Sequence, residues 1–460
     1  MFVYFCRNHR NASTIFRPLS LAFRQKLLWF SSSHVLLFCQ RNKHKTDNIF
    51  KNRRLHTTIL LYLHSTKNRV MDKLFEKSYK KIEEVSTDYV RNIHEEIAWD
   101  DRLVAVLGAR GVGKTTLLLQ HIKLYDNKPT ALYVTADDLW FTSHTLVELA
   151  DTFYKNGGRT LYIDEIHRYH NWSIELKNIY DTYSNLRIVY TGSSILDIHR
   201  GGADLSRRQL EYTMYGLSFR EYLLLAHDID MPIYTLDDVI SNRVKFPTGD
   251  NRPIALFKEY MRGGYYPFFM QRDSHSRLQQ IVNQVLEVDI PKFAELTLTT
   301  IEKLKRLMYV IAQSVPFKPN YSKLGRDLEC HRTSVSDLIL LLDKSHLIQI
   351  LRDDSFGVSS LGKVDKVYLG NTHLAYALSD TTPDVGNLRE TFFISSVKPK
   401  HDVMASSVSD FKVGKYTFEV GGKNKKQKQI QGIENAFIVK DDIEYGYLNV
   451  VPLWAFGFLY

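Results

Sequence analysis

Short runs of β-branched and aliphatic residues are spaced along residues 100–215, and segments with helical spacing of apolar positions separate them. Such runs are typical of strands in a parallel sheet, because helices cover both faces of each strand. The pattern therefore predicts an α/β domain. Its expected strands are "RLVAVLG" (102–108), "ALYVTADD" (131–138), "RTLYIDEIHRY" (159–169), "LRIVYTGSS" (186–194) and "QLEYTMY" (209–215).

In the second half of the chain the pattern changes to helical spacing. Residues 253–300 are expected to form helices joined by "RGGYYP", in which Pro267 marks a turn. Residues 301–350 contain three helical periods and an apolar strand-like end, the pattern of a winged helix-turn-helix. The remaining residues predict a helix at "GNLRETFF", two strands joined at Gly414-Lys415, and a final strand with a docking tail.

A phosphate-binding motif lies between the first predicted strand and its helix. Gly108-x-x-x-x-Gly113-Lys114-Thr115 matches the P-loop pattern in full. Glycines let the backbone bring its N–H groups against phosphates at a partly positive helix N-terminus. Lys114 is expected to reach the β- and γ-phosphates, and the Thr115 hydroxyl to ligate Mg²⁺. The predicted nucleotide contacts in this loop are Gly108, Ala109, Arg110, Gly111, Val112, Gly113, Lys114, Thr115 and Thr116.

An acidic pair follows the apolar strand "RTLYI". Asp164 is placed to hold Mg²⁺ with the nucleotide, and Glu165 to orient and deprotonate an attacking water. By itself, a pair of acids after a strand is ordinarily part of a solvated loop. The P-loop match by itself could likewise be a glycine-rich turn with a surface lysine. Together, fifty residues apart with room for a strand between them, they predict a site for ATP or GTP.

Two more segments carry candidate residues for this site. The strand at 186–194 ends on small hydroxyl residues, so Thr191 or Ser193 could sense the γ-phosphate, although an ordinary turn is an equal alternative. We include Ser193 among the nucleotide contacts. Arg207 and Arg208 precede the last strand, and one of them could act as an arginine finger in cis or from a neighbouring subunit. A surface arginine pair is the alternative.

With these motifs the chain resembles prokaryotic AAA-like ATPases in which a P-loop domain precedes a helical segment, a winged-helix-like region and a C-terminal domain similar to restriction endonucleases. The resemblance extends over essentially all of 71–460 and implies ATP as the nucleotide. The family's Leu-x-Gly-Arg motif becomes Leu205-Ser-Arg-Arg208, which assigns the arginine role to Arg208. The resemblance rests on "GARGVGKTT", "LYIDEIHRY", "YTGSS", "LSRRQLEYTMYGLSFREYL", "YMRGGYYPFF" and the closing domain.

The same resemblance gives the closing domain a candidate second metal site. Restriction-like nucleases hold Mg²⁺ with an Asp on one strand and an acid on the next, while a nearby Lys polarises the water. Asp410, Glu419 and Lys423 correspond to this set, with Glu390 as an outer acid. Lys423 follows Glu419 by four residues where such nucleases have two. Either a Gly-Gly bulge restores the register, or the site has decayed.

Charge limits the case for nucleic acid as a partner. The formal net charge of the 460 residues is +10, but residues 1–70 hold thirteen Lys and Arg against one acid. The remaining residues hold 48 basic and 50 acidic side chains, so the body of the chain is about neutral. If the predicted winged helix binds DNA, "HRTSVSD" would open the recognition helix, and the residues facing the groove would be His331, Arg332, Thr333 and Ser334. Because no basic cluster surrounds them, we favour packing over DNA readout.

Residues 1–70 allow three interpretations: a mitochondrial transit peptide, a transmembrane anchor, or an upstream extension of the reading frame. We favour the extension, because an amphipathic helix of mixed charge begins directly at Met71. Cys6, Cys39 and Cys330 form neither a zinc motif nor a disulfide framework, so a reducing cytoplasm is the default.

The expected organisation is α/β, with an AAA-like P-loop parallel sheet, a helical and winged-helix region, and an α+β endonuclease-like domain. Its segments are a basic extension (1–70, disordered or not native), an ATPase domain (71–225), a helical region (226–352) and the closing domain (353–460). One hypothesis is a cytoplasmic ATPase that uses ATP and Mg²⁺ in DNA processing or defence, with DNA and further copies of the chain as partners and without a membrane partner. The other is a nucleotide-controlled switch or assembly module with an inactive endonuclease-like domain.

Overall fold

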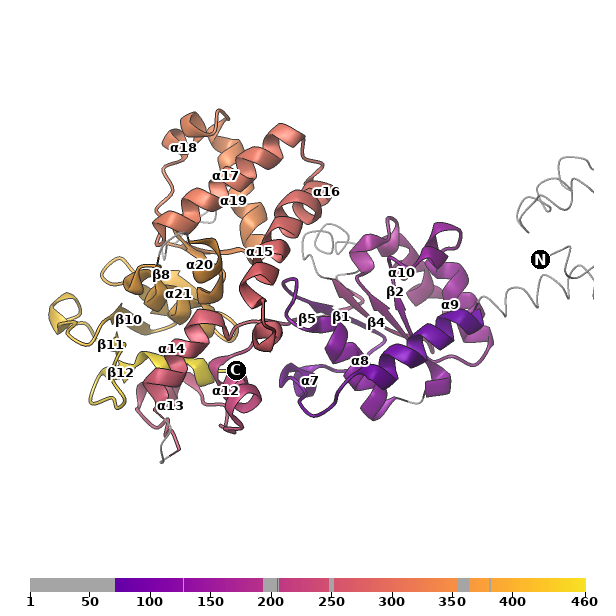
Figure 1. The fold of residues 1–460 in the computed structure, drawn as a ribbon, viewed down its shortest axis with the longest axis horizontal. Coiled ribbons are helices and arrows are strands. Elements are labelled where there is room, and N and C mark those ends of the chain that lie inside the picture. Colours follow the sequence, from indigo (N-terminus) through magenta and orange to yellow (C-terminus); the bar gives the residue numbers. More distant parts are fainter. Residues whose placement is uncertain are drawn as a thin grey trace, which may run out of the picture. The chain divides into compact units, whose positions relative to one another are not determined.

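In the computed structural model, five parallel strands form the sheet that the apolar runs predict (Figure 1). The strand order is β2-β3-β4-β1-β5, so β4 lies between β1 and β3. Ligands of open parallel sheets bind at the carboxyl ends of such strands, where the order reverses. The strands are β1 (Leu103–Leu107), β2 (Ala131–Thr135), β3 (Thr160–Asp164), β4 (Arg187–Gly192) and β5 (Leu210–Thr213).

The structure describes residues 71–126, 128–192, 205, 207–247, 252–353, 364–379 and 382–460. The chain divides into two compact units, Met1–Lys80 and Lys81–Tyr460. In the first unit the described residues, 71–80, are helical. The predictions for residues 1–70 and for Ser193 lie outside the described residues.

Helices flank the parallel sheet. α8 begins at Lys114 directly after the glycine-rich loop, and it buries Leu117, Leu118 and Ile122. α9 begins with a capping box in which Thr145 and Glu148 exchange hydrogen bonds, so its first turn is well satisfied. The elements of this part are α7 (Ile93–Glu96), α8 (Lys114–Tyr125), η1 (Lys128–Thr130), η2 (Leu139–Thr142), α9 (Leu146–Lys155), η3 (Ile166–Arg168) and α10 (Trp172–Thr182).

A helical region follows β5. One nearly continuous helix in it consists of α15, a wide π-helical turn η6, and α16. Pro291, near the start of α16, has no N–H and its ring crowds the preceding turn, which gives a physical reason for the wide turn before it. The elements are α12 (Phe219–His227), α13 (Leu236–Ile240), α14 (Pro253–Gly263), η5 (Pro267–Met270), α15 (Ser274–Gln284), η6 (Val285–Asp289) and α16 (Ile290–Ala294).

Three helices and a two-stranded antiparallel sheet come next, where three helical periods and a strand are predicted. They are α17 (Leu298–Ser314), α18 (Tyr321–Asp327), α19 (Arg332–Lys344), β6 (Ile348–Arg352) and β7 (Val364–Leu369). The buried side chains of α19 are Val335, Leu338, Ile339 and Leu342, at the spacing of one helical face. The assignment of this region as a winged helix stays a prediction.

The closing part contains a mixed sheet with the order β12-β11-β10-β9-β8. Neighbours are antiparallel from β8 to β10 and parallel from β10 to β12. The predicted helix at "GNLRETFF" and the two strands joined at Gly414-Lys415 are present. The elements are α20 (Thr372–Leu378), α21 (Val385–Val397), β8 (Val403–Ala405), β9 (Phe411–Val413), β10 (Tyr416–Gly421), η7 (Gln427–Gln429), β11 (Ala436–Lys440), β12 (Val450–Pro452) and η8 (Leu453–Phe458).

The end of the chain packs against helices that lie far away in the sequence. Phe458 of η8 contacts Phe219 of α12, with ring centroids 5.5 Å apart. Phe392 of α21 packs edge-on against Phe257 of α14 at 4.6 Å. Thus α12, which the predicted boundary at residue 225 divides, packs with the closing segment, and Figure 1 shows α12 to α14 beside it.

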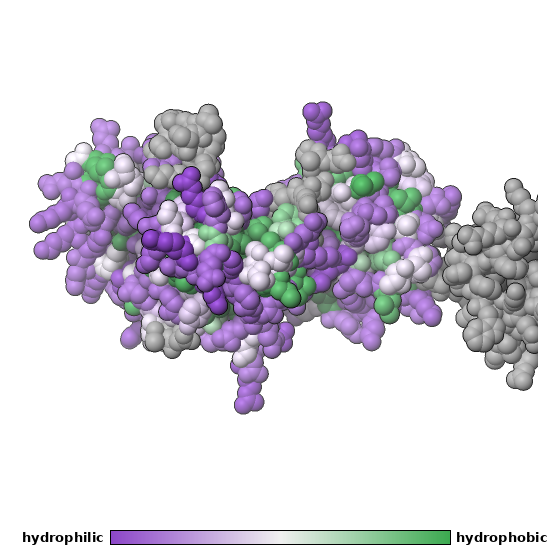
Figure 2. All heavy atoms as spheres, turned by 90° about the horizontal axis from the view of Figure 1, so that it is seen from above, coloured by the Kyte–Doolittle hydropathy of each residue, from purple (hydrophilic) through white to green (hydrophobic). Residues whose placement is uncertain are grey.

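No helix in the described ranges is both long and apolar enough to cross a membrane. The face drawn in Figure 2 is largely hydrophilic, with apolar side chains gathered in limited groups.

Phe393 provides a test of the closing core. Its ring is fully buried and packs against Phe411, Phe418 and Phe456, at centroid distances of 4.8, 5.2 and 4.9 Å. We expect Phe393→Ala to lower the free energy of unfolding by about 3–5 kcal/mol, because it removes apolar contacts and leaves a cavity. Urea unfolding followed by circular dichroism measures this. Tyr445→Ala is the control, since Tyr445 is 82% exposed and its loss should change little.

Candidate nucleotide-binding site

The loop between β1 and α8 has the backbone that a phosphate-binding loop requires. Gly108, Gly111 and Gly113 all have positive φ, at 149°, 86° and 103°. A Cβ atom on Gly108 would lie 2.2 Å from the Met214 carbonyl oxygen, beyond the end of β5, so no larger residue fits there. All three positions therefore favour glycine by conformation, and Gly108 is required by space as well.

Lys114 is the first residue of α8, and its side chain turns back into the loop. Its Nζ donates to the carbonyl oxygens of Gly108 and Ala109, at 2.9 and 2.8 Å. The side chain is buried, and this burial lowers the pKa of Lys114 to about 8, while the Glu165 and Asp164 carboxylates act in the opposite direction. An ammonium group with this environment gains strongly from a bound anion.

Asp164, at the end of β3, receives hydrogen bonds from three directions. Thr115 Oγ1 of α8 and the Tyr133 hydroxyl of β2 both donate to Oδ2 at 2.7 Å. Thr191 Oγ1 of β4 donates to Oδ1. The Thr115 hydroxyl and the Asp164 carboxylate are thus brought into contact, and both are oxygen ligands of the kind that Mg²⁺ prefers. Thr115 directly follows Lys114 in the sequence.

Glu165 follows in the left-handed conformation, with φ of 54°. Its N–H donates to Thr191 Oγ1 at 3.0 Å, which holds this uncommon turn in place. Its carboxylate lies 3.5 Å from His167 Nε2 and 3.8 Å from Arg168 Nε. Burial lowers the pKa of His167 to about 3, so this histidine is neutral near pH 7. Thr191, one of two candidates at the strand end, thereby contacts both acids.

A buried arginine supports the loop from outside. Arg91 donates to the Val112 carbonyl of the loop at 3.1 Å and to the Gly216 carbonyl at 2.8 Å. Its Nε forms an ion pair with Glu221 of α12 at 2.8 Å. Sequence reasoning missed Arg91, because no motif or periodicity marks an arginine that pairs with a residue 130 positions away.

Other predicted residues have mixed placements. Thr116 is exposed on α8, and Arg110 pairs with Asp289 of η6 at 3.0 Å. Arg208 pairs with Asp181, at the end of α10, at 3.1 Å. A finger role for Arg208 stays a prediction.

The acids of the closing domain come from three elements. Asp410, directly before β9, accepts the Val420 N–H at 2.9 Å and lies 3.7 Å from Lys366 Nζ. Glu419 of β10 accepts from Ser409 Oγ at 2.9 Å and pairs with Lys425. Burial raises the pKa of Asp410, and the neighbouring Glu419 raises it further.

Glu390 of α21 accepts the Tyr368 hydroxyl at 2.7 Å, and burial and the nearby Asp410 raise the pKa of Glu390.

The lysine near Glu419 differs from the predicted one. Lys423 is exposed, and β10 pairs with β11 in unbroken register through Gly421, so a bulge in this ladder does not restore the predicted spacing. Gly421 stands two residues after Glu419, and a Cβ there would lie 2.7 Å from Lys425 Cδ. The missing side chain makes room for Lys425. Among the described residues, no three His, Cys, Asp or Glu are grouped as metal ligands.

Comparisons with known proteins bear on the type of domain that contains the loop and the acidic pair. Residues 100–223 match the model of an AAA domain, and residues 254–385 match a domain of unknown function, DUF8612. An uncharacterized protein of Methanocaldococcus jannaschii is 28% identical over 309 residues, which are 63% of this chain and 62% of the relative. The match thus spans less than two thirds of that protein. The matched model and the strand order make residues 100–223 an AAA-like P-loop domain.

Two solved structures are also similar in part. The Walker-type ATPase of Pyrococcus abyssi aligns with 62% of this chain and 93% of its own, at 13% identity and a TM-score of 0.35. AMPPCP-bound DnaA of Aquifex aeolicus aligns with 60% and 88%, at 16% identity and a TM-score of 0.23.

The lowered pKa of Lys114 predicts proton uptake on nucleotide binding. Phosphates favour the charged ammonium and raise its pKa, so above pH 8, where much of Lys114 is neutral, binding must add a proton. Affinity for Mg·ATP should therefore be full at pH 6.5 and fall as the pH rises through about 8. Calorimetric titrations in two buffers of different ionisation enthalpy, at pH 6.5 and 8.5, measure this. An equal proton balance at both pH values would contradict it.

Proposed function

We propose that this protein binds ATP with Mg²⁺ and hydrolyses it. The observation that supports this most strongly is the contact between Thr115 and Asp164 beside the buried Lys114, within an AAA-like P-loop domain. A strand end, a loop and a helix start together bring a cation, a hydroxyl and a carboxylate to one edge of the sheet. A phosphate chain with a bound metal ion engages all three groups, because the ammonium binds phosphate while the hydroxyl and the carboxylate ligate the metal.

Each residue has a distinct role in this proposal. Thr115 and Asp164 would hold Mg²⁺, which neutralises charge on the phosphates when it is bound. Lys114 binds the β- and γ-phosphates through its ammonium group. Glu165 accepts a proton from the attacking water, and the Thr191 hydroxyl keeps its backbone in place. The loop reads phosphates rather than the base, so the preference for ATP rests on the family resemblance.

Glu165→Gln separates binding from hydrolysis. We expect phosphate release to fall by about 10²–10⁴-fold, because the amide cannot accept the proton, while the Kd for Mg·ATP changes little. Lys114→Ala should lose binding itself. The control is Glu434→Gln, which makes the same change at an exposed position. Wild-type turnover in Glu165→Gln would remove Glu165 from the proposed mechanism.

A second candidate function concerns the closing domain. Asp410, Glu419 and Glu390 are carboxylates gathered within one small domain, and Lys366 and Lys425 contact two of them. The raised pKa values of Asp410 and Glu390 mean that a cation beside them would be stabilising. We propose that these carboxylates support metal-dependent cleavage of DNA. Lys425, in place of the predicted Lys423, would then polarise the attacking water. The alternative is an inactive domain that serves ATP-controlled assembly.

The exposed residues of the helical region help to choose between DNA cleavage and an inactive assembly domain. His331, Arg332, Thr333 and Ser334 are exposed at the start of α19, as a DNA-reading helix requires, but Asp327, Glu329 and Asp337 are exposed near them. These acids keep protein packing as the favoured role of the predicted winged helix. We also propose that the protein forms a homo-oligomer in which Arg208 reaches the nucleotide of a neighbouring subunit. Its proposed location is the cytoplasm.

Lys425 and Lys423 form a matched pair for testing cleavage. With supercoiled plasmid DNA and Mg²⁺, we expect Lys425→Ala to slow cleavage by roughly a hundredfold, the loss typical when one charge-stabilising group is removed. Lys423→Ala should cleave at the wild-type rate, because its side chain is exposed. Asp410→Asn should be inactive. Absence of cleavage by the wild-type protein would favour the inactive assembly module.

A further inference from the structure

A carboxylate from the helical region reaches the nucleotide site. Asp289, the last residue of η6, has 5% of its surface exposed. Arg110 Nη1 of the loop lies 3.0 Å from its Oδ2, and Arg168 Nη2 lies 3.8 Å from its Oδ1. Asp289 thus joins the loop after β1 to the turn after β3, from a helix more than 120 residues further along the chain.

The chain of charges continues to the proposed base. Arg168 is also 3.8 Å from Glu165 through its Nε, so Arg110, Asp289, Arg168 and Glu165 alternate in sign along one row. Lys114 meanwhile donates to two carbonyl oxygens of its own loop. In this arrangement Asp289 neutralises the charges of Arg110 and Arg168, and backbone carbonyl oxygens accept the hydrogen bonds of Lys114. A triphosphate would compete with Asp289 for the guanidinium groups.

The helical region also contacts the loop directly. A Cβ on Gly111 would lie 3.0 Å from both Ile281 of α15 and Phe268 of η5. A Cβ on Gly113 would lie 3.7 Å from Cγ of Pro267, at ordinary packing distance. A change of the loop on binding a ligand would therefore be transmitted to α15 and η6 through packed atoms.

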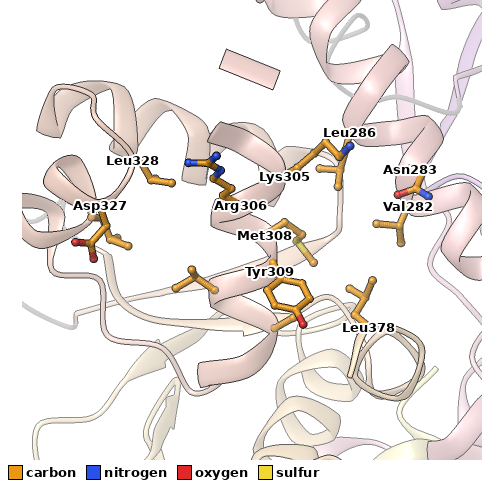
Figure 3. Close-up of a pocket in the computed structure, with 13 residues that line it drawn as sticks. Val282, Asn283, Leu286, Lys305, Arg306, Met308, Tyr309, Asp327, Leu328 and Leu378 are labelled. Carbon is orange, nitrogen blue, oxygen red and sulfur yellow. The ribbon is translucent and has the colours of Figure 1, made fainter. Parts of the chain in front are cut away.

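η6 has room to respond. On another side α15 and η6, through Val282, Asn283 and Leu286, line a cavity of about 520 Å³ with residues of α17 such as Met308 and Tyr309 (Figure 3). Close packing would hold a helix rigidly, whereas a cavity leaves part of it without contacts. The wide π turn and Pro291 further weaken the backbone hydrogen bonding at this point.

We propose that Asp289 is a latch between the helical region and the nucleotide site, an inference that rests on the proposed binding of Mg·ATP. Asp289 holds Arg110 and Arg168, and through Arg168 it restrains Glu165. Bound triphosphate takes over the guanidinium of Arg110, the pair with Asp289 weakens, and η6 shifts relative to the loop. Nucleotide state is thereby communicated to the region that precedes the closing domain.

Asp289→Asn tests the latch against a matched control. Removing the charge removes both the competitor for Arg110 and the repulsion toward phosphate, so the Kd for Mg·ATP should fall by roughly fivefold or more, within the usual range of coupling between sites. Glu287→Gln makes the same change two residues away in η6, where Glu287 is half-exposed and pairs with Lys305 at 2.9 Å. Its Kd should stay within about twofold of the wild type.

The outcomes separate the two proposals. Failure of the wild-type protein to bind Mg·ATP would overturn the proposed function. Binding by the wild type, with Asp289→Asn no tighter than Glu287→Gln, would overturn the latch alone. A wild-type measurement covers the case in which Asp289→Asn does not fold: hydrogen exchange of residues 281–294 should become faster with Mg²⁺ and a non-hydrolysable ATP analogue. Unchanged or slower exchange there would also overturn the latch.

Discussion

The carboxylate of Asp164 is the point on which the nucleotide site depends. It accepts hydrogen bonds from α8, β2 and β4 through Thr115, Tyr133 and Thr191. These groups meet only because β3 is placed between β2 and β4, which the strand order β2-β3-β4-β1-β5 provides. A buried carboxylate must be satisfied by donors, so the same contacts that stabilise Asp164 also align the hydroxyl and the acid that a magnesium ion would need.

Local pattern was sufficient to predict the parts of this site that lie in one stretch of chain. The apolar runs gave the five strands, and the glycine spacing gave the loop, because the conformation at Gly108 and Gly113 excludes other residues. Contacts between distant segments could not be predicted in this way. Arg91 reaches Glu221, and Asp289 reaches Arg110, without any signal in spacing or composition. The contact of Tyr133 with Asp164 could have been predicted, because Tyr133 lies on a predicted strand, β2, that pairs with the strand ending at Asp164.

The closing domain illustrates the same limit. The resemblance to restriction-like nucleases pointed to Lys423, four residues after Glu419, as its partner. In the fold β10 continues without a bulge, and Lys425 pairs with Glu419 across Gly421 instead. The boundary at residue 225 falls within α12, whose Phe219 packs against the last residues of the chain. Helical periodicity reveals that a helix has an apolar face, but it does not reveal which distant segment covers that face.

We propose that residues 108–116, Asp164 and Glu165 form a site for Mg·ATP. An experimental structure of the protein with Mg²⁺ and a non-hydrolysable ATP analogue tests it most directly. We expect a triphosphate in the loop, with Lys114 at the β- and γ-phosphates and the metal beside Thr115 and Asp164. An analogue bound elsewhere, with Lys114 still donating to the Gly108 and Ala109 carbonyls, would rule out this site.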